Sequence, residues 1–362
     1  MRTSTAAAAA LALALLLGTA PVAGAMTTTP NDRVFVIYVN IGWNSNLASE
    51  YSSLDFFRRI ADPERKPNES DAAPLDYKPD IVLANEVPHG SASDGDWHDK
   101  FGFRNKLEEY VGGQWSWFHS DQGATAVFFR SDRFEAVGHH SWSELTGDDC
   151  SGSAKGNNEI AVKLRPFHKE ANVIASSVHF EKTATRSCLA QNLARANSQI
   201  ENQWGTRPLT LLGGDFNEKP EPEKQEGAGN RDWRIEDEPA CWWLDFNADD
   251  NCTAPAGWYY DTVRARNWSP AAPGDICSEW TRENSSRLSN ENADQCDSEK
   301  SRIDYIWARW EGSGGSPQTT DGRIEGASAD RGFWNKPGTT EGEDAQTRRY
   351  SDHRAVRAVV RF

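Results

Sequence analysis

The stretch LTLLGGDFNEKP, from Leu209 to Pro220, decides the fold of this chain. It opens with an apolar run of strand length, reaches a glycine pair, and then presents Asp215 and Asn217 with one residue between them. Alternate residues of a strand point to the same face, so an extended chain through Phe216 places both side chains in one site. The glycine pair would let the backbone approach a ligand. A strand followed by an ordinary Asx turn would give the same pattern, so the interpretation needs support from the rest of the chain.

Other apolar runs also end in groups suited to metal and phosphate chemistry. These groups are Asn40 in VFVIYVN, Glu86 in IVLANEV, His179 in VIASSVHFEK and Asp304 in RIDYIWAR. Asp352 and His353 precede RAVRAVVRF, whose alternation is typical of a final strand. A glutamate at the end of a buried strand is unfavourable unless it is paired or metal-bound, which favours a functional role for Glu86.

This ordered set resembles the endonuclease/exonuclease/phosphatase superfamily, which includes deoxyribonuclease I, exonuclease III, neutral sphingomyelinases and inositol polyphosphate phosphatases. The resemblance runs from about Val34 to Phe362, with a divergent stretch between Glu218 and Lys300. It implies an α/β fold of the deoxyribonuclease I type. Such a fold is a four-layer sandwich of two mixed β-sheets, face to face and flanked by helices, with the site at one end of the sheets.

The resemblance also implies a metal centre and a catalytic base. Asn40, Glu86 and Asp352 would hold the metal, and their hard oxygen atoms suit Mg²⁺ or Mn²⁺. His353 would act as the general base that activates water, because imidazole titrates in the useful pH range. Asp304 would orient this imidazole and stabilise its cationic form.

The remaining predicted site residues would act on the phosphate. Asp215 and Asn217 would position the water or hold the phosphate, and His179 would protonate the leaving oxygen or stabilise the transition state. The deoxyribonuclease I branch pairs this histidine with a glutamate on a preceding strand. Here GATAVFF, residues 123–129, carries no acidic residue at the matching place, so the carboxylate partner of His179 is left open.

The activity expected from the resemblance is that of a secreted, divalent-metal-dependent phosphodiester hydrolase acting on DNA as an endonuclease. A sphingomyelinase-like phospholipid phosphodiesterase or a phosphatase is the alternative, for which CWWLDF, residues 241–246, is the candidate apolar segment. A non-catalytic binding protein on the same fold is a third reading. The pattern leaves open the choice between DNA and RNA, endo- or exo-cleavage, and the number of metal ions. We expect a monomer.

The first 25 residues have the features of a secretory signal peptide. Arg2 is followed by an apolar run from Ala6 to Leu17 and by small residues up to Ala25. This run is shorter than the roughly 20 residues that a membrane span needs, and no later run is longer and more apolar. We therefore expect an extracellular protein without a transmembrane segment. No linker or repeat divides residues 26–362, which we expect to form a single domain.

Charge and cysteine usage agree with an exported protein. The chain has 54 acidic and 39 basic residues and a formal net charge of -15, which does not indicate a general nucleic-acid binder. A bound divalent cation would supply positive charge where phosphate must bind. The 6 cysteines fit a disulfide-bonded protein, and four of them lie in the predicted insertion at about 218–300. Proximity in the sequence favours the pairs Cys241 with Cys252 and Cys277 with Cys296, which leaves Cys150 with Cys188.

Periodicity gives the remaining expected elements. Helices are predicted at 46–61, 103–110 and 186–204, and a short strand at 258–265. NNEIAVKLRPF and NVIASSVHFEK should pair as neighbouring strands. Residues 311–344 are predicted to form a polar, glycine-rich connection.

Overall fold

The computed structural model of the chain describes residues 28–41, 57, 60, 77–87, 100–120, 125–143, 158–168, 172–180, 200, 202–204, 209–216, 243–244, 259–261, 282–283, 300–301, 304–309, 323–329, 353 and 355–361. The expected signal peptide and every cysteine lie outside these residues, as do two predicted site residues, Asn217 and Asp352.

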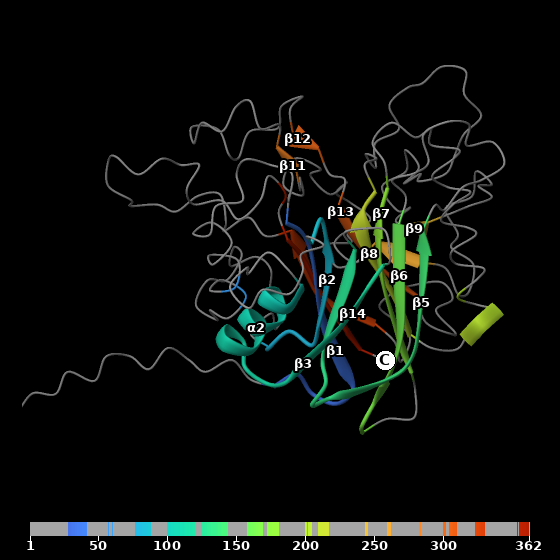
Figure 1. Cartoon of the computed structure of the whole chain (residues 1–362). Helices are drawn as coiled ribbons and strands as arrows, with labels where there is room; N and C mark the ends of the chain where they lie inside the picture. Colours follow the sequence, from blue (N-terminus) through green and yellow to red (C-terminus); the bar gives the residue numbers. More distant parts are fainter. Residues whose placement is uncertain are drawn as a thin grey trace, which may run out of the picture.

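The described strands form two sheets that lie face to face (Figure 1). The first sheet has the strand order β14-β15-β1-β2-β4-β3, with β1 at Arg33–Asn40, β2 at Ile81–Asn85, β3 at Trp115–His119, β4 at Ala126–Arg130, β14 at Arg323–Ala329 and β15 at Val356–Arg361. The second has the order β5-β6-β7-β8-β13-β10-β9, with β5 at Phe134–Ser143, β6 at Asn158–Pro166, β7 at Val173–His179, β8 at Leu209–Asp215, β9 at Trp243–Leu244, β10 at Tyr259–Asp261 and β13 at Asp304–Arg309. A separate pair consists of β11 (Arg282–Glu283) and β12 (Lys300–Ser301).

Each sheet is mixed because it contains one parallel pair, β1 with β2 and β7 with β8, among antiparallel neighbours. Parallel neighbours need a crossover connection, which usually carries a helix. The predicted helices at 46–61 and 186–204 fall in these two crossovers. Of their residues that the structure describes, Phe57, Ile60 and Ile200 are helical and buried.

Apolar side chains fill the space between the sheets, because alternate residues of each strand face inward. They include Val34, Val36, Leu83 and Val127 from the first sheet and Val162, Ala175, Leu211 and Ile306 from the second. The outer face of the first sheet packs on a helical layer that includes Phe57, and that of the second on Ile200 and Trp204. The predicted four-layer fold is therefore confirmed.

Helix α2 (Lys100–Tyr110) covers the outer face of the first sheet (Figure 1). It buries Phe103 and Leu107, one turn apart on the same face. It ends where Gly112, at φ 78°, donates its N–H to the Leu107 carbonyl at 3.2 Å, a left-handed C-terminal cap. The predicted helix is thus confirmed and begins three residues earlier than expected. No helix within the described ranges is long and apolar enough to cross a membrane.

The glycine pair of β8 makes room for the protein's own strands. A Cβ atom on Gly213 would lie 2.5 Å from Leu83 Cδ1 of the first sheet. A Cβ atom on Gly214 would lie 2.4 Å from the Val178 carbonyl oxygen of β7. Gly214 therefore requires glycine because the clash is with backbone, whereas a side chain at Gly213 would force the end of the Leu83 side chain to move. The sequence suggested that the glycine pair lets the backbone approach a ligand, whereas in the structure the two glycines lie against Leu83 and Val178.

The connection predicted at 311–344 contains strand β14, which pairs with β15 at the edge of the first sheet. Its sequence, RIEGASA, has little apolar alternation, because an edge strand needs only backbone hydrogen bonds to pair. β10 lies within the strand predicted at 258–265, of which the structure describes residues 259–261, and part of CWWLDF forms β9 beside it.

Glu159 is fully buried on the outer face of the second sheet, which sequence reasoning did not anticipate. The Ser176 hydroxyl donates to its Oε1 atom, while its Oε2 atom has no hydrogen-bond partner within the part of the chain that the structure describes. Burial raises the pKa of Glu159 from 4.5 to about 8. The folded state therefore keeps a proton that the unfolded state releases.

This proton predicts a pH-dependent stability that Glu159→Gln removes. As the pH rises from 4.5 towards 8, the unfolded state binds fewer protons than the folded state, so the wild-type protein loses stability. The full loss is roughly 3–5 kcal/mol at 1.36 kcal/mol per pKa unit. Glutamine stays neutral, so the stability of the variant relative to wild type, measured by urea unfolding, should rise from pH 5 to about pH 8 and then level off.

The matched control is Glu135→Gln, on the neighbouring strand β5, where the carboxylate is exposed and pairs with Arg165. Its unfolding free energy should differ from wild type by the same small amount at every pH. A Glu159→Gln difference that did not change with pH would contradict the burial of an uncharged Glu159.

Candidate active site

The strand register brings predicted site residues from both sheets to one end of the sandwich. Asn40 ends β1, and Glu86 follows directly after β2, which runs parallel to β1. His179 ends β7 and is paired with Asp215 at the end of β8, which is paired in turn with Asp304 at the start of β13. Residues from separate parts of the sequence thus share one edge for a topological reason.

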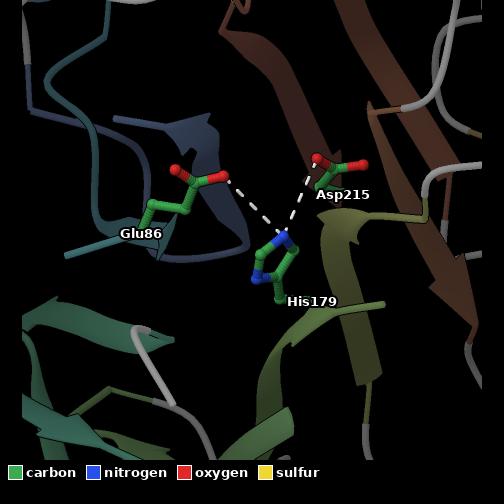
Figure 2. Close-up of side chains that lie close together, drawn as sticks. All are labelled: Glu86, His179 and Asp215. Atoms are coloured by element: carbon green, nitrogen blue, oxygen red, sulfur yellow. Dashed lines mark ion pairs between the residues drawn. The ribbon is translucent and has the colours of Figure 1, made fainter. Parts of the chain in front are cut away.

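A carboxamide connects two carboxylates across the gap between the sheets. Asn40 Nδ2 donates to Glu86 Oε1 at 3.1 Å and to Asp215 Oδ2 at 3.2 Å. His179 Nε2 lies 3.8 Å from Glu86 Oε1 and 3.9 Å from Asp215 Oδ2, and its ring points between the two acids (Figure 2). The side chains of His179 and Glu86 are each 23% exposed, so this part of the site faces solvent.

Glu86 adopts a left-handed backbone conformation, with φ 54°. This conformation is uncommon for a residue with a Cβ atom and is unfavourable by about 1–3 kcal/mol. It turns the chain directly after β2 and directs the carboxylate towards Asn40 and the second sheet. Such strain is typical of residues held in place by a functional site.

A histidine and an aspartate form a buried pair beside this cluster. His353 Nδ1 lies 2.8 Å from Asp304 Oδ2, and the side chains are 3% and 0% exposed. A carboxylate at Nδ1 accepts a hydrogen bond from that nitrogen, so the neutral ring carries its lone pair on Nε2. His353 Nε2 lies 3.8 Å from Asp215 Oδ2, so this lone pair points into the same site.

Tyr38 is a site residue that sequence reasoning missed. It lies two residues before Asn40 on the same face of β1, and its Cβ atom lies next to Gly213 of the second sheet. Burial raises the pKa of Tyr38 well above 10, and the charges of Asp304, Asp215 and Glu86 raise it further. The hydroxyl therefore keeps its proton under a group of three carboxylates. Period-two alternation from Asn40 was the signal that could have identified it.

The carboxylate partner of His179, which the sequence left open, comes from neighbouring strand ends. Among the residues that the structure describes, Glu86 and Asp215 are the acids within ion-pair distance of its imidazole. Glu159 lies on the adjacent strand β6 but faces the outer side of the second sheet, where it contacts Ser176. No acid on β4 is needed to pair with this histidine.

The donor atoms fit a divalent cation. Among the described residues, Glu86, His179 and Asp215 each offer a ligand atom, and these atoms lie within 4.8 Å of one another. Asp215, Asp304 and His353 form a second such group, which shares Asp215 with the first. Carboxylate oxygens next to one another repel unless a cation or a proton lies between them. The arrangement suits a hard, oxygen-preferring ion better than a thiolate site for zinc.

The structure thus places six of the eight predicted site residues together. They are Asn40, Glu86, His179, Asp215, Asp304 and His353. Asn217 and Asp352 fall outside the described residues, although each adjoins a described one, Phe216 and His353. The roles assigned to the eight residues remain predictions.

Cation binding at Glu86 can be measured without a substrate. Glu86→Gln keeps the shape of the side chain but removes its charge, so Mn²⁺ should bind at least about 10-fold more weakly by isothermal titration calorimetry. Glu135→Gln, which neutralises an exposed acid of β5, should bind Mn²⁺ as wild type does. Equal Mn²⁺ affinity in the two variants would show that Glu86 is not a ligand.

Solved structures share this fold over most of the chain. They include an endonuclease/exonuclease/phosphatase from Bacteroides vulgatus (14% identity, TM-score 0.53, covering 91% of this chain and 99% of that one). TDP2 of D. rerio, in complex with a single-strand DNA product, has 12% identity and a TM-score of 0.53, with 91% and 99% of the two chains covered. A mannosyl-6-phosphatase of Bacteroides thetaiotaomicron has 12% identity and a TM-score of 0.51, with 91% and 100% covered.

No family model matches the sequence, and no curated protein matches it. At these low identities the similarity to the solved structures concerns the fold. Together with the strand order and the site at the strand ends, it confirms the resemblance seen in the sequence: the chain has the fold of the endonuclease/exonuclease/phosphatase superfamily.

Proposed function

We propose that this chain is a secreted, divalent-metal-dependent phosphodiester hydrolase that cleaves DNA as an endonuclease. The observation that carries the proposal is the convergence of two carboxylates, an amide and two histidines from both sheets at one end of the fold. The similarity in fold to TDP2 in complex with a single-strand DNA product supports a nucleic-acid substrate. The apolar N-terminal stretch and the 6 cysteines support export.

The reaction needs a nucleophile, and the His353–Asp304 pair is built to produce one. The lone pair of His353 Nε2 accepts a proton from water as the water attacks phosphorus. The Asp304 carboxylate, hydrogen-bonded to Nδ1, holds the ring in this tautomer and stabilises the imidazolium that forms. Because Asp304 is fully buried, solvent does not screen this interaction.

The other residues act on the phosphate and the cation. Asn40 and Glu86, with Asp352, would hold Mg²⁺ or Mn²⁺, which when bound neutralises charge on the phosphoryl oxygens. Asp215 and Asn217 position the attacking water or the phosphate. His179, at the open side of the site, donates a proton to the leaving oxygen or a hydrogen bond to the transition state.

Cleavage of supercoiled plasmid DNA tests this proposal. The mature, disulfide-intact protein should nick plasmid with Mg²⁺ or Mn²⁺ and not with EDTA. His353→Ala and Asp215→Ala should each lower the rate by about 10²–10⁴-fold, the usual contribution of a general acid or base. His140→Ala, which removes an exposed histidine of β5 that packs on Trp142, is the matched control and should retain full activity.

Intact plasmid under both metals would overturn the nuclease assignment and leave the phosphoester chemistry to other substrates. The fold similarity to a mannosyl-6-phosphatase is nearly as high as that to TDP2, which favours sugar phosphates as the second candidate. Phosphate release from mannose 6-phosphate and choline phosphate release from sphingomyelin liposomes distinguish the two remaining classes. Partner binding with no turnover of any phosphoester would support a non-catalytic protein.

A further inference from the structure

Two fully buried polar residues lie between the sheets, each close in sequence to a residue of the site. Asn85 ends β2 and directly precedes Glu86. Ser177 lies in β7, two residues before His179 and on the same face of the strand. Neither residue belongs to the predicted catalytic or metal-binding set. Their side chains come from different sheets, so any contact between them ties the two sheets together.

The contact between these residues is a compact hydrogen-bond network. Asn85 Nδ2 donates to the Val178 carbonyl oxygen at 2.6 Å. Ser177 Oγ lies 2.9 Å from Asn85 Oδ1 and 3.2 Å from the Ala84 carbonyl oxygen, and its single proton can go to either acceptor. Both ends of the Asn85 carboxamide are therefore used across the gap between the sheets. The main-chain oxygen of Asn85 also accepts a hydrogen bond from the N–H of Ile41 at 3.0 Å, which connects Asn85 to the residue that follows β1.

The network lies directly beneath the pair of site residues that face each other across the gap. Glu86 follows Asn85 with a left-handed φ of 54°, so the position of its backbone depends on how Asn85 is held. His179 follows Val178, whose carbonyl oxygen is the acceptor of the Asn85 amide. The resulting separation of Glu86 Oε1 and His179 Nε2 is 3.8 Å. A change of sheet spacing at Asn85 would be transmitted to this distance with no intervening flexible residue.

A neighbouring serine shows what a buried hydroxyl does when it is not part of this network. Ser176 and Ser177 are neighbours in β7, and both are completely buried. It faces the opposite side of the second sheet and donates to Glu159, away from the site. The two serines therefore separate the general effect of removing a buried hydroxyl from a specific effect on the site.

We propose that Asn85 and Ser177 are positioning residues that set the separation of Glu86 and His179, and through it the affinity of the site for a divalent cation and the rate of the reaction. The inference rests on the proposed function for the identity of the reaction. The predicted effect on cation binding does not depend on which substrate the protein cleaves. Residues that orient the groups around a metal commonly change metal affinity or activity by about 10–100-fold when removed.

The test compares Ser177→Ala with Ser176→Ala in the full mature chain. Ser177→Ala should weaken Mn²⁺ binding by about 10-fold in isothermal titration calorimetry and lower kcat by a similar factor, with KM for plasmid DNA little changed. Ser176→Ala should keep both values within about 2-fold of wild type, because its hydroxyl does not reach the site. Ser177→Thr keeps the hydroxyl and should recover most of the Mn²⁺ affinity.

A combination with Glu86→Gln distinguishes positioning from general destabilisation. If Ser177 acts through Glu86, then Ser177→Ala should cause no further loss of Mn²⁺ affinity in the Glu86→Gln background. A loss of stability alone would instead add equally in both backgrounds, and urea unfolding of each variant measures that contribution separately. Additive losses of affinity would overturn the proposal.

Other outcomes are also decisive. Wild-type Mn²⁺ affinity and kcat in Ser177→Ala, or equal losses in Ser176→Ala, would overturn the positioning role. Wild-type protein that binds Mn²⁺ but cleaves no phosphodiester would contradict the proposed function alone, because the affinity arm still tests Ser177. Wild-type protein that binds no Mn²⁺ would overturn both proposals.

Discussion

Two sheets packed through apolar side chains must hold polar and charged groups between them at the end where their strands stop. A buried polar group is unfavourable unless it is hydrogen-bonded, and a buried charge unless it is paired. Asn40 satisfies this constraint by donating to Glu86 and Asp215, which come from the two sides of the gap. His353 satisfies it through Asp304. Because the side chains of the site come from both sheets, the spacing between the sheets determines the distances within the site. A change in that spacing therefore alters the site.

The same constraint explains why this edge of the fold suits a cation. Burial raises the pKa of Tyr38 most, and Asp304, Asp215 and Glu86 raise it further, so three negative charges lie close to one point of this edge. Like charges that are held close together repel one another. A divalent cation or a proton relieves this repulsion, and a cation also attracts the phosphate that an acidic chain would otherwise repel. The formal net charge of -15 is therefore compatible with a phosphodiester substrate, provided that the cation binds first.

Site residues could be identified from the sequence where a polar side chain interrupts or ends an apolar run. Asn40, Glu86 and Asp304 stand at the ends of apolar runs, and parallel or antiparallel register then brings such ends together. The supporting residues gave no such signal. Asn85 and Ser177 look like ordinary polar positions within strands, and their contact depends on how two sheets pack, which no local pattern encodes. The edge strand β14 escaped prediction for a related reason, because backbone pairing places little demand on side chains.

Diffraction from crystals grown with Mn²⁺, recorded near the manganese absorption edge, tests the central claim that both sheets build one cation site. We predict an anomalous peak at coordination distance from a carboxylate oxygen of Glu86, in the gap between the ends of β2 and β8. Glu86 directly follows β2 of the first sheet and Asp215 ends β8 of the second, so a cation between them would lie beside both sheets. A peak only on surface acids, or none at saturating Mn²⁺, would show that the two sheets do not form a cation site at this edge.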